Sequence, residues 1–233
     1  MNRVAVLARV ELVLLLRNKT AAALGLAMPL AIGVGFALTR GGGDWAGSIT
    51  MQLLVVHGLT VYISATTALV ARRQDLSLKR LRGGEASEPV ILAGVMAPMV
   101  VLGLVQGALL PTIAVIADAP MPRDLLALAA GIVGGTVVAA GAALATASFT
   151  TTAETAQLTT TPLFAATFGG AMWALSSPTV TPLMLAAPGG ATAALVRAGF
   201  EGGSAWGPLG AMAVWTVATV AVGRRYFRWD PRA

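Results

Sequence analysis

The sequence predicts an all-α integral membrane protein. Hydrophobic residues make up 56% of the chain, charged residues only 11%, and the mean hydropathy is +0.78, whereas about a quarter of the residues of a soluble domain are charged. The apolar residues gather in long runs, and a helix needs about 20 such residues to cross a bilayer. Backbone groups that face lipid must be satisfied within their own element, which favours helices. We expect one transmembrane domain over residues 1–233.

The N-terminal segment, residues 1–19, predicts an interfacial helix. Arg9 and Glu11 interrupt its apolar run, which is too short to span a membrane. The segment has no signal-peptide cleavage pattern, so we expect it to be retained.

Six spans are expected after this helix. Proline at positions 98 and 111 predicts a kink in the third of them. The apolar segment 176–205 is broken by prolines and paired glycines, so it predicts a re-entrant or extracellular helical element that packs on protein. The expected spans are 21–38, 49–70, 90–116, 125–149, 158–175 and 207–226.

The basic residues predict the orientation of these spans. With six spans and a cytoplasmic N-terminus, thirteen of the sixteen lysines and arginines lie on the cytoplasmic side, and only Arg40, Arg123 and Arg197 lie on the other. This bias is what the positive-inside rule expects, so both termini are predicted to be cytoplasmic. The net charge of +6 is read in the same way, as a determinant of topology and of contact with phospholipid, and no nucleic-acid partner is expected.

Few residues of this chain are suited to catalysis. It has no cysteine and one histidine, and neither of its two lysines follows a glycine as in a phosphate-binding P-loop. No carboxylate falls within the expected spans. We therefore expect no catalytic residue, no metal site and no enzyme activity in this chain alone, and uphill transport would require a separate nucleotide-hydrolysing chain.

Polar residues in the second span predict a pathway. His57, Thr60, Ser64 and Thr67 recur at steps of three and four residues and so are expected to share one helix face. Polar side chains in a membrane avoid lipid and line interiors or routes. The alternative for His57 is a buried imidazole bonded to a neighbouring helix. The candidate pathway residues are Gln52, His57, Thr60, Ser64, Thr67, Thr160 and Thr167.

The fourth span carries a stripe of small residues at every fourth position, which predicts close packing of neighbouring helices. An Ala- and Gly-rich composition can also produce such a stripe by chance. Its members are Gly131, Gly135, Ala139, Ala143 and Ala147.

The loop 72–88 is the longest charged island of the chain. Asp75 and Lys79 form an i,i+4 pair, Leu78 and Leu81 share a face, and paired glycines follow, so a short cationic helix is expected. This helix is either a charge cluster that lies on phospholipid headgroups or a docking element for a cytoplasmic partner.

Four segments resemble the membrane subunit of a type-2 ABC exporter of the kind found in actinobacterial drug and antibiotic export. They are residues 9–19 (RVELVLLLRNK), 71–83 (ARRQDLSLKRLRG), 153–158 (AETAQL) and 187–200 (APGGATAALVRAGF). In that family the first cytoplasmic loop is a coupling helix that sits in a cleft of the ATP-binding subunit. The resemblance therefore implies that ATPase coupling involves Arg72, Arg73, Gln74, Asp75, Leu78, Lys79, Arg80, Leu81, Arg82 and Glu154.

The resemblance also implies the assembly. Two permease copies, as a homodimer or a heterodimer with a similar permease, would join two ATP-binding subunits, which bind ATP and Mg²⁺, and this chain would hold no cofactor. Spans two and five would line the route of an amphipathic substrate out of a bacterial plasma membrane. An ATP-independent carrier or a membrane scaffold is the alternative, and an intramembrane enzyme centred on His57 is disfavoured by the scarcity of catalytic residues.

Overall fold

The computed structural model describes residues 3–39, 44–83 and 87–230. Within these ranges all regular elements are helices, as the sequence predicts. Parts of the expected interfacial helix (residues 1–2), of the first turn (residues 40–43) and of the charged loop (residues 84–86) lie outside the described residues. The elements are α1 (Arg3–Arg17), α2 (Lys19–Ala22), η1 (Ala23–Ala27), α3 (Met28–Thr39), α4 (Trp45–Val55), η2 (Val56–Ile63), α5 (Ser64–Gln74), α6 (Ser77–Arg82), α7 (Glu88–Ile116), α8 (Leu125–Ala147), α9 (Ala156–Leu175), α10 (Pro182–Ala186), α11 (Gly190–Glu201) and α12 (Trp206–Tyr226).

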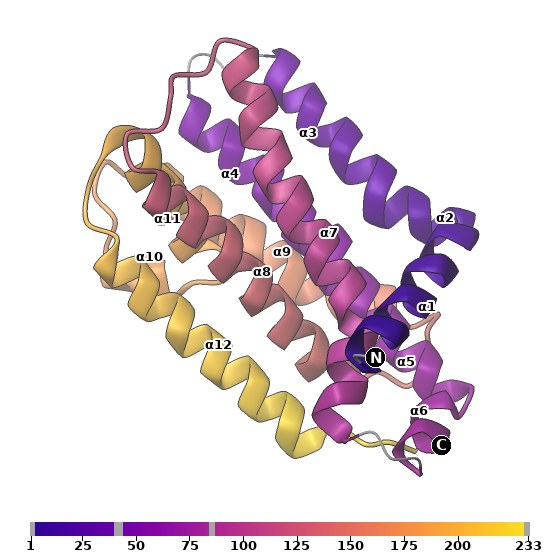
Figure 1. Cartoon of the computed structure of the whole chain (residues 1–233). Coiled ribbons are helices and arrows are strands. Elements are labelled where there is room, and N and C mark those ends of the chain that lie inside the picture. The colour runs from indigo at the N-terminus through magenta and orange to yellow at the C-terminus, as the bar shows by residue number, and fades with distance from the viewer. Residues whose placement is uncertain (1–2, 40–43, 84–86, 231–233) are drawn as a thin grey trace.

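The long helices form one bundle, with α3, α7, α8 and α12 following one another across it (Figure 1). The continuous helix formed by α4, η2 and α5 is the most buried of the long apolar helices. It contacts α3, α7, α8, α9 and α11. The central position of this helix means that a change at either of its ends reaches most of the bundle.

Four described helices are long and apolar enough to cross a bilayer: Trp45–Gln74, Glu88–Ile116, Leu125–Ala147 and Trp206–Tyr226. They correspond to the second, third, fourth and sixth expected spans and indicate a membrane protein. The first expected span contains a shorter apolar stretch, Gly25–Phe36, and the fifth corresponds to α9, which carries Thr159, Thr160 and Thr161 in its first turns. The six-span topology stays a prediction.

The small-residue stripe of α8 packs as predicted. All five of its members are buried. A Cβ atom added at Gly135 would lie 2.1 Å from Cε1 of His57, and one added at Gly131 would lie 3.4 Å from Cβ of Leu195. The stripe therefore brings η2 and α11 close to the backbone of α8. The carboxylate of Asp124 begins this helix by accepting hydrogen bonds from the amides of Leu126 and Ala127.

Two π-helical segments, η1 and η2, lie against each other in the bundle. Pro29 has no amide hydrogen and so cannot donate to the carbonyl of Gly25, its α-helical partner. The hydroxyl of Thr60 in η2 lies 2.8 Å from that carbonyl oxygen, and Nε2 of Gln106 lies 3.4 Å from it. Side chains from α7 and η2 thus satisfy the backbone that the proline leaves open.

The broken segment 176–205 folds into α10 and α11 and packs on protein, whereas its re-entrant or extracellular placement stays a prediction. Ten of the twelve residues of α11 are buried, and it contacts α4, α8, α9 and α12. Two adjacent glycines allow the chain to enter α11: Gly189 has φ +81°, and a Cβ atom at Gly190 would lie within 2 Å of the carbonyl oxygen of Met184.

The helices α1 and α6 and the end of α12 lie at the same end of the bundle (Figure 1). The helix α1 packs on α7, where Leu7 meets Gly94. Its outer side exposes Val6, Val10, Val13, Leu14 and Leu16. The helix expected over residues 1–19 is therefore present from Arg3, and its apolar exposed side fits an interfacial position.

Candidate functional site

The elbow, residues Ala71 to Gly83, turns sharply between α5 and α6. Leu76 occupies the left-handed region with φ +61°, an uncommon conformation for a residue with a branched side chain, and 41% of its surface is exposed. Oδ1 of Asp75 accepts a hydrogen bond of 2.9 Å from the Ser77 amide, at the start of α6. Burial of the carboxyl group opposes ionisation, but hydrogen bonds from Ser77 and the charge of Arg72 outweigh it and lower the pKa of Asp75.

The short helix α6 is fixed to the bundle by its apolar side. Leu78 is fully buried, and Leu81 packs against the same cluster. Burying a leucine side chain contributes about 1.5–3 kcal/mol. Arg80 is exposed and donates to the Asp75 carbonyl, while the side chains of Lys79 and Arg82 lie outside the described residues. The cluster under α6 consists of Leu69, Val70, Leu78, Ile91, Val95, Leu144, Ala147 and Trp229.

The two arginines that end α5 point in different directions. Arg72 binds both carboxylate oxygens of Glu11 in α1, with Nε 2.7 Å from Oε1 and Nη2 3.0 Å from Oε2. Arg73 is fully buried and donates to the carbonyls of Ala147, at 2.9 Å, and Thr150. Its cation thus lies at the C-terminus of α8, where the helix dipole favours positive charge. Of the two, only Arg72 retains some exposure.

Gln74 joins the elbow to the bend that precedes α9. Its Oε1 accepts a hydrogen bond of 2.8 Å from the Ala153 amide, next to Glu154. The carboxylate of Glu154 is fully exposed, and hydrogen bonds from its own backbone amide and from the Thr152 hydroxyl lower its pKa. Gln74 and Glu154, two of the predicted coupling residues, thus lie close together at the same end of the bundle.

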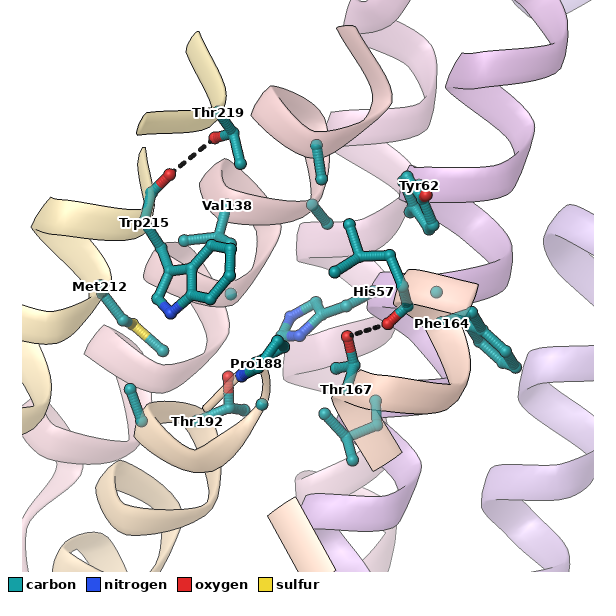
Figure 2. A pocket seen from close by; sticks show the side chains of 18 of the residues that line it. His57, Tyr62, Val138, Phe164, Thr167, Pro188, Thr192, Met212, Trp215 and Thr219 are labelled. Atoms are coloured by element: carbon teal, nitrogen blue, oxygen red, sulfur yellow. Dashed lines mark hydrogen bonds between the residues drawn. The ribbon is translucent and has the colours of Figure 1, made fainter. Parts of the chain in front are cut away.

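A cavity of about 680 Å³, including its open mouth, lies between η2, α8, α9, the start of α11 and α12. Figure 2 shows the imidazole of His57 pointing into it, with Trp215 and Met212 on one side and Thr167 and Phe164 on the other. The wall is mostly apolar. Two of the predicted pathway residues, His57 and Thr167, meet here although 110 positions separate them.

His57 is held by one hydrogen bond among the described residues, 3.2 Å from Nε2 to the Ile132 carbonyl oxygen. A carbonyl accepts only, so Nε2 carries the proton and Nδ1 keeps its lone pair. Gly135 leaves the space that the ring occupies. The bond is the one that the structural alternative for His57 expects, and the same ring also lines the cavity; its role in a pathway stays a prediction. Within the described ranges, no group of three histidines or carboxylates is placed to hold a metal ion.

Sequence reasoning missed most of the cavity wall. Tyr62, Phe164, Met212 and Trp215 line it, and Nε1 of Trp215 donates to the Ala186 carbonyl at 3.1 Å. A tryptophan inside an apolar span is one signal that points to such a wall. The aliphatic and aromatic residues that the other helices contribute to the wall give no comparable signal, because apolar side chains are also expected where a helix faces lipid.

The predicted polar face of the second span is only partly present. His57 points into the cavity, whereas Thr60 and Ser64 both approach Gly25 on the other side of the helix. Ser64 and Thr67 line a separate open groove. That groove, about 1320 Å³ including open space, also contains Glu11, Arg72 and Gln157.

The two remaining pathway residues lie in neither cavity. Gln52 is fully buried in α4, and its amide has no hydrogen-bond partner among the described residues. The hydroxyl of Thr160 is buried and bonds back to the Ala156 carbonyl at 2.8 Å. Back-bonding of this kind is common for threonine in helices and needs no ligand.

No protein-family model matches the chain, and no curated protein sequence matches it. The geometry of the elbow and of the cavity therefore carries the functional argument.

Proposed function

We propose that this chain is the membrane subunit of an ATP-driven ABC exporter of the type-2 class, and that it moves an amphipathic small molecule, peptide or lipid-like substrate outward across a bacterial plasma membrane. A separate subunit binds ATP and Mg²⁺ and hydrolyses the nucleotide. The observation that carries the proposal is α6, a short basic helix fixed to one end of the bundle by Leu78 with Gln74, Leu76 and Arg80 exposed around it. Its outer surface is free for a partner.

The charge distribution supports a cytoplasmic position for α6. The helices α1 and α6 and the end of α12, whose sequences carry many of the basic residues, lie at one end of the bundle (Figure 1). In the proposed topology, with six spans and both termini cytoplasmic, this end meets the ATP-binding subunit and anionic phospholipid headgroups.

The continuity of α4, η2 and α5 supports a mechanical role for the elbow. A displacement of α6 acts on α5, and α5 continues into η2, which carries His57, Gly58 and Tyr62 of the cavity wall. ATP-driven closure of the partner dimer would thus change the cavity through one helix. The hydrogen bond between Gln74 and Ala153 extends the same contact to the bend before α9.

The proposed complex holds two copies of the permease, as a homodimer or with a similar permease, and two ATP-binding subunits. The exposed surface of α6 defines which residues to test. Leu81 already packs on the bundle, so Arg80 and Leu76 are the better contact residues.

The test is reconstitution with a candidate ATP-binding subunit, sought among the genes that flank this one. We expect Arg80→Glu to abolish substrate-stimulated ATP hydrolysis and to weaken assembly of the complex. Arg123→Glu is the matched control, because Arg123 is an exposed arginine just before α8, and the elbow contacts the opposite end of that helix. Unchanged assembly and hydrolysis in Arg80→Glu would contradict the docking role of α6. Transport by the chain alone, without ATP, would instead establish an ATP-independent carrier.

A further inference from the structure

The cavity around His57 has a wall without charge. None of the nineteen described residues that line it is an aspartate, glutamate, lysine or arginine. A charged ligand would lose its hydration here without gaining an ion-pair partner, which is unfavourable in an apolar surround.

Most polar groups of this wall already use their protons. The hydroxyls of Thr167 and Thr219 donate to the Leu163 and Trp215 carbonyls, each at 2.8 Å, as two dashed lines in Figure 2 show. The Tyr62 hydroxyl lies 2.9 Å from the hydroxyl oxygen of Thr146. The wall therefore has few donors to offer a ligand, and Thr192 is the other hydroxyl on it.

His57 supplies an acceptor. Its Nε2 donates to Ile132, and Nδ1 is the remaining nitrogen of a ring that points into the cavity (Figure 2). The described wall holds no carboxylate that could pair with an imidazolium cation. A neutral imidazole with Nε2 protonated accepts a hydrogen bond at Nδ1. The lone pair on Nδ1 would repel an anionic group of a ligand, whereas a neutral hydroxyl could donate a hydrogen bond to it.

We propose that the cavity binds an uncharged, largely apolar small molecule that carries a hydroxyl group, and that this hydroxyl donates to Nδ1 of His57. Phe164, Met212 and Trp215 contact the apolar body of the ligand, and Thr192 provides a second polar contact for it. The inference deepens the proposed function, on which it rests for the statement that this molecule is the transported substrate. The binding itself needs neither ATP nor a partner subunit.

The test measures binding to the purified full chain in lipid nanodiscs, by energy transfer from tryptophan to a pyrene probe. The probes are 1-pyrenemethanol, its methyl ether, 1-pyrenemethylammonium and 1-pyrenesulfonate. We expect the alcohol to bind about 3- to 10-fold more tightly than the ether, the net effect of one neutral hydrogen bond. The two charged probes should bind more weakly than either. Equal binding of alcohol and ether, as expected for a lipid acyl chain, or tighter binding of a charged probe would overturn the proposal.

Three variants locate the site. His57→Phe keeps a ring and removes the acceptor, and we expect it to abolish the preference for the alcohol. Ile132 keeps a partner in that variant, because the Thr136 hydroxyl also donates to its carbonyl. Val138→Phe fills the cavity and should weaken binding of both neutral probes about tenfold or more, whereas Val137→Phe on the exposed side of α8 should not. Equal effects of Val138→Phe and Val137→Phe would exclude this cavity as the site.

The two proposals fail in different ways. Alcohol-selective binding without ATP-driven transport in the reconstituted complex would leave the cavity assignment intact and contradict the exporter. ATP-driven transport without alcohol-selective binding would support the exporter and contradict the cavity assignment.

Discussion

Thr60 and Gly25 tie two π-helical segments together: the hydroxyl oxygen of Thr60 lies 2.8 Å from the carbonyl oxygen of Gly25 and 2.6 Å from Oε1 of Gln106. The hydroxyl has one proton, which these two acceptors share. All three residues are buried. π-Helical segments are rare and occur often at functional sites, and this pair lies directly beside the residues that line the His57 cavity.

Thr60→Val should therefore destabilise the protein. The substitution keeps the side-chain shape and leaves two buried acceptors short of a donor, which costs about 1–3 kcal/mol. Thr112→Val in α7 is the control, because the exposed Thr112 hydroxyl bonds only to the Ala108 carbonyl of its own helix. The free energy of unfolding in mixed micelles measures the effect, and equal losses in the two variants would show that the Thr60 contact adds nothing.

The ion pair between Glu11 and Arg72 should hold α1 against α5. The side chains of Glu11 and Arg72 are only 11% and 22% exposed, respectively. Glu11→Gln removes the negative charge of this pair, and we expect the free energy of unfolding to fall by about 1–3 kcal/mol. The charge exchange Glu11→Arg with Arg72→Glu should recover part of it. Arg9→Gln, at an exposed position of the same helix, is the control. Denaturant titration of the unmodified protein and the three variants gives the comparison, and no recovery in the exchange would argue against a direct pair.

Gly189→Ala should be more harmful than Gly202→Ala. Both glycines have positive φ, +81° and +89°, but a Cβ atom at Gly189 would lie 2.1 Å from the Thr167 carbonyl oxygen, whereas nothing lies within 4 Å of one at Gly202. The conformational cost alone is about 1–3 kcal/mol. The further loss at Gly189 measures the steric contact, and thermal unfolding should reveal it together with weaker probe binding. Equal destabilisation would contradict the close approach.

Leu76→Gly should separate stability from coupling. Glycine adopts the left-handed conformation of this position without the cost of about 1–2 kcal/mol that a side chain carries, but it raises the entropy of the unfolded chain. We expect a net gain of about 0.5 kcal/mol and, with the exposed side chain removed, weaker ATPase coupling. Leu76→Ala keeps the backbone cost and should weaken coupling without the gain. A loss of stability in Leu76→Gly would contradict the inference that Leu76 is strained in its left-handed conformation.

The pKa of Asp75 gives the turn a pH dependence. The group's pKa is lowered below its ordinary value of 3.8, so its stabilising effect is complete above pH 3.8 and disappears as the pH falls through the lower pKa of the folded state. The NMR shift of the Ser77 amide, which bonds to Asp75, should follow that titration. In Asp75→Asn the shift should be flat over the same range, and a flat response in the unmodified protein would contradict the assignment.

Much of the fold was predictable from the sequence, because length, hydropathy and small-residue spacing act locally. The order of the helices, the buried stripe of α8 and the short helix α6 follow from such patterns. The register of η2 does not, because hydrogen bonding to the fifth residue leaves no mark in side-chain type. Pro29 was the available signal near η1, but nothing comparable precedes η2.

The candidate site was harder to predict than the fold. The sequence places Arg72 and Arg73 side by side, and only the C-terminus of α8 decides that Arg73 turns inward. The cavity needs residues from η2, α8, α9, α11 and α12 to meet. His57 and Thr167 were identified as polar residues in apolar spans, whereas Trp215 and Phe164 acquire their meaning only from the helices beside them.

The packing of Trp229 on the cluster that holds Leu78 bears on how the protein is made. Leu78 leaves the ribosome about 150 residues before Trp229, so for most of synthesis α6 lacks one wall of its binding pocket on the bundle. The pocket is completed when the segment after α12 arrives and Phe227 and Trp229 pack edge to face, with ring centroids 5.5 Å apart. The packing of α6 thus depends on a segment made much later, and a partner that recognises α6 would distinguish molecules that have this segment from those that do not yet have it.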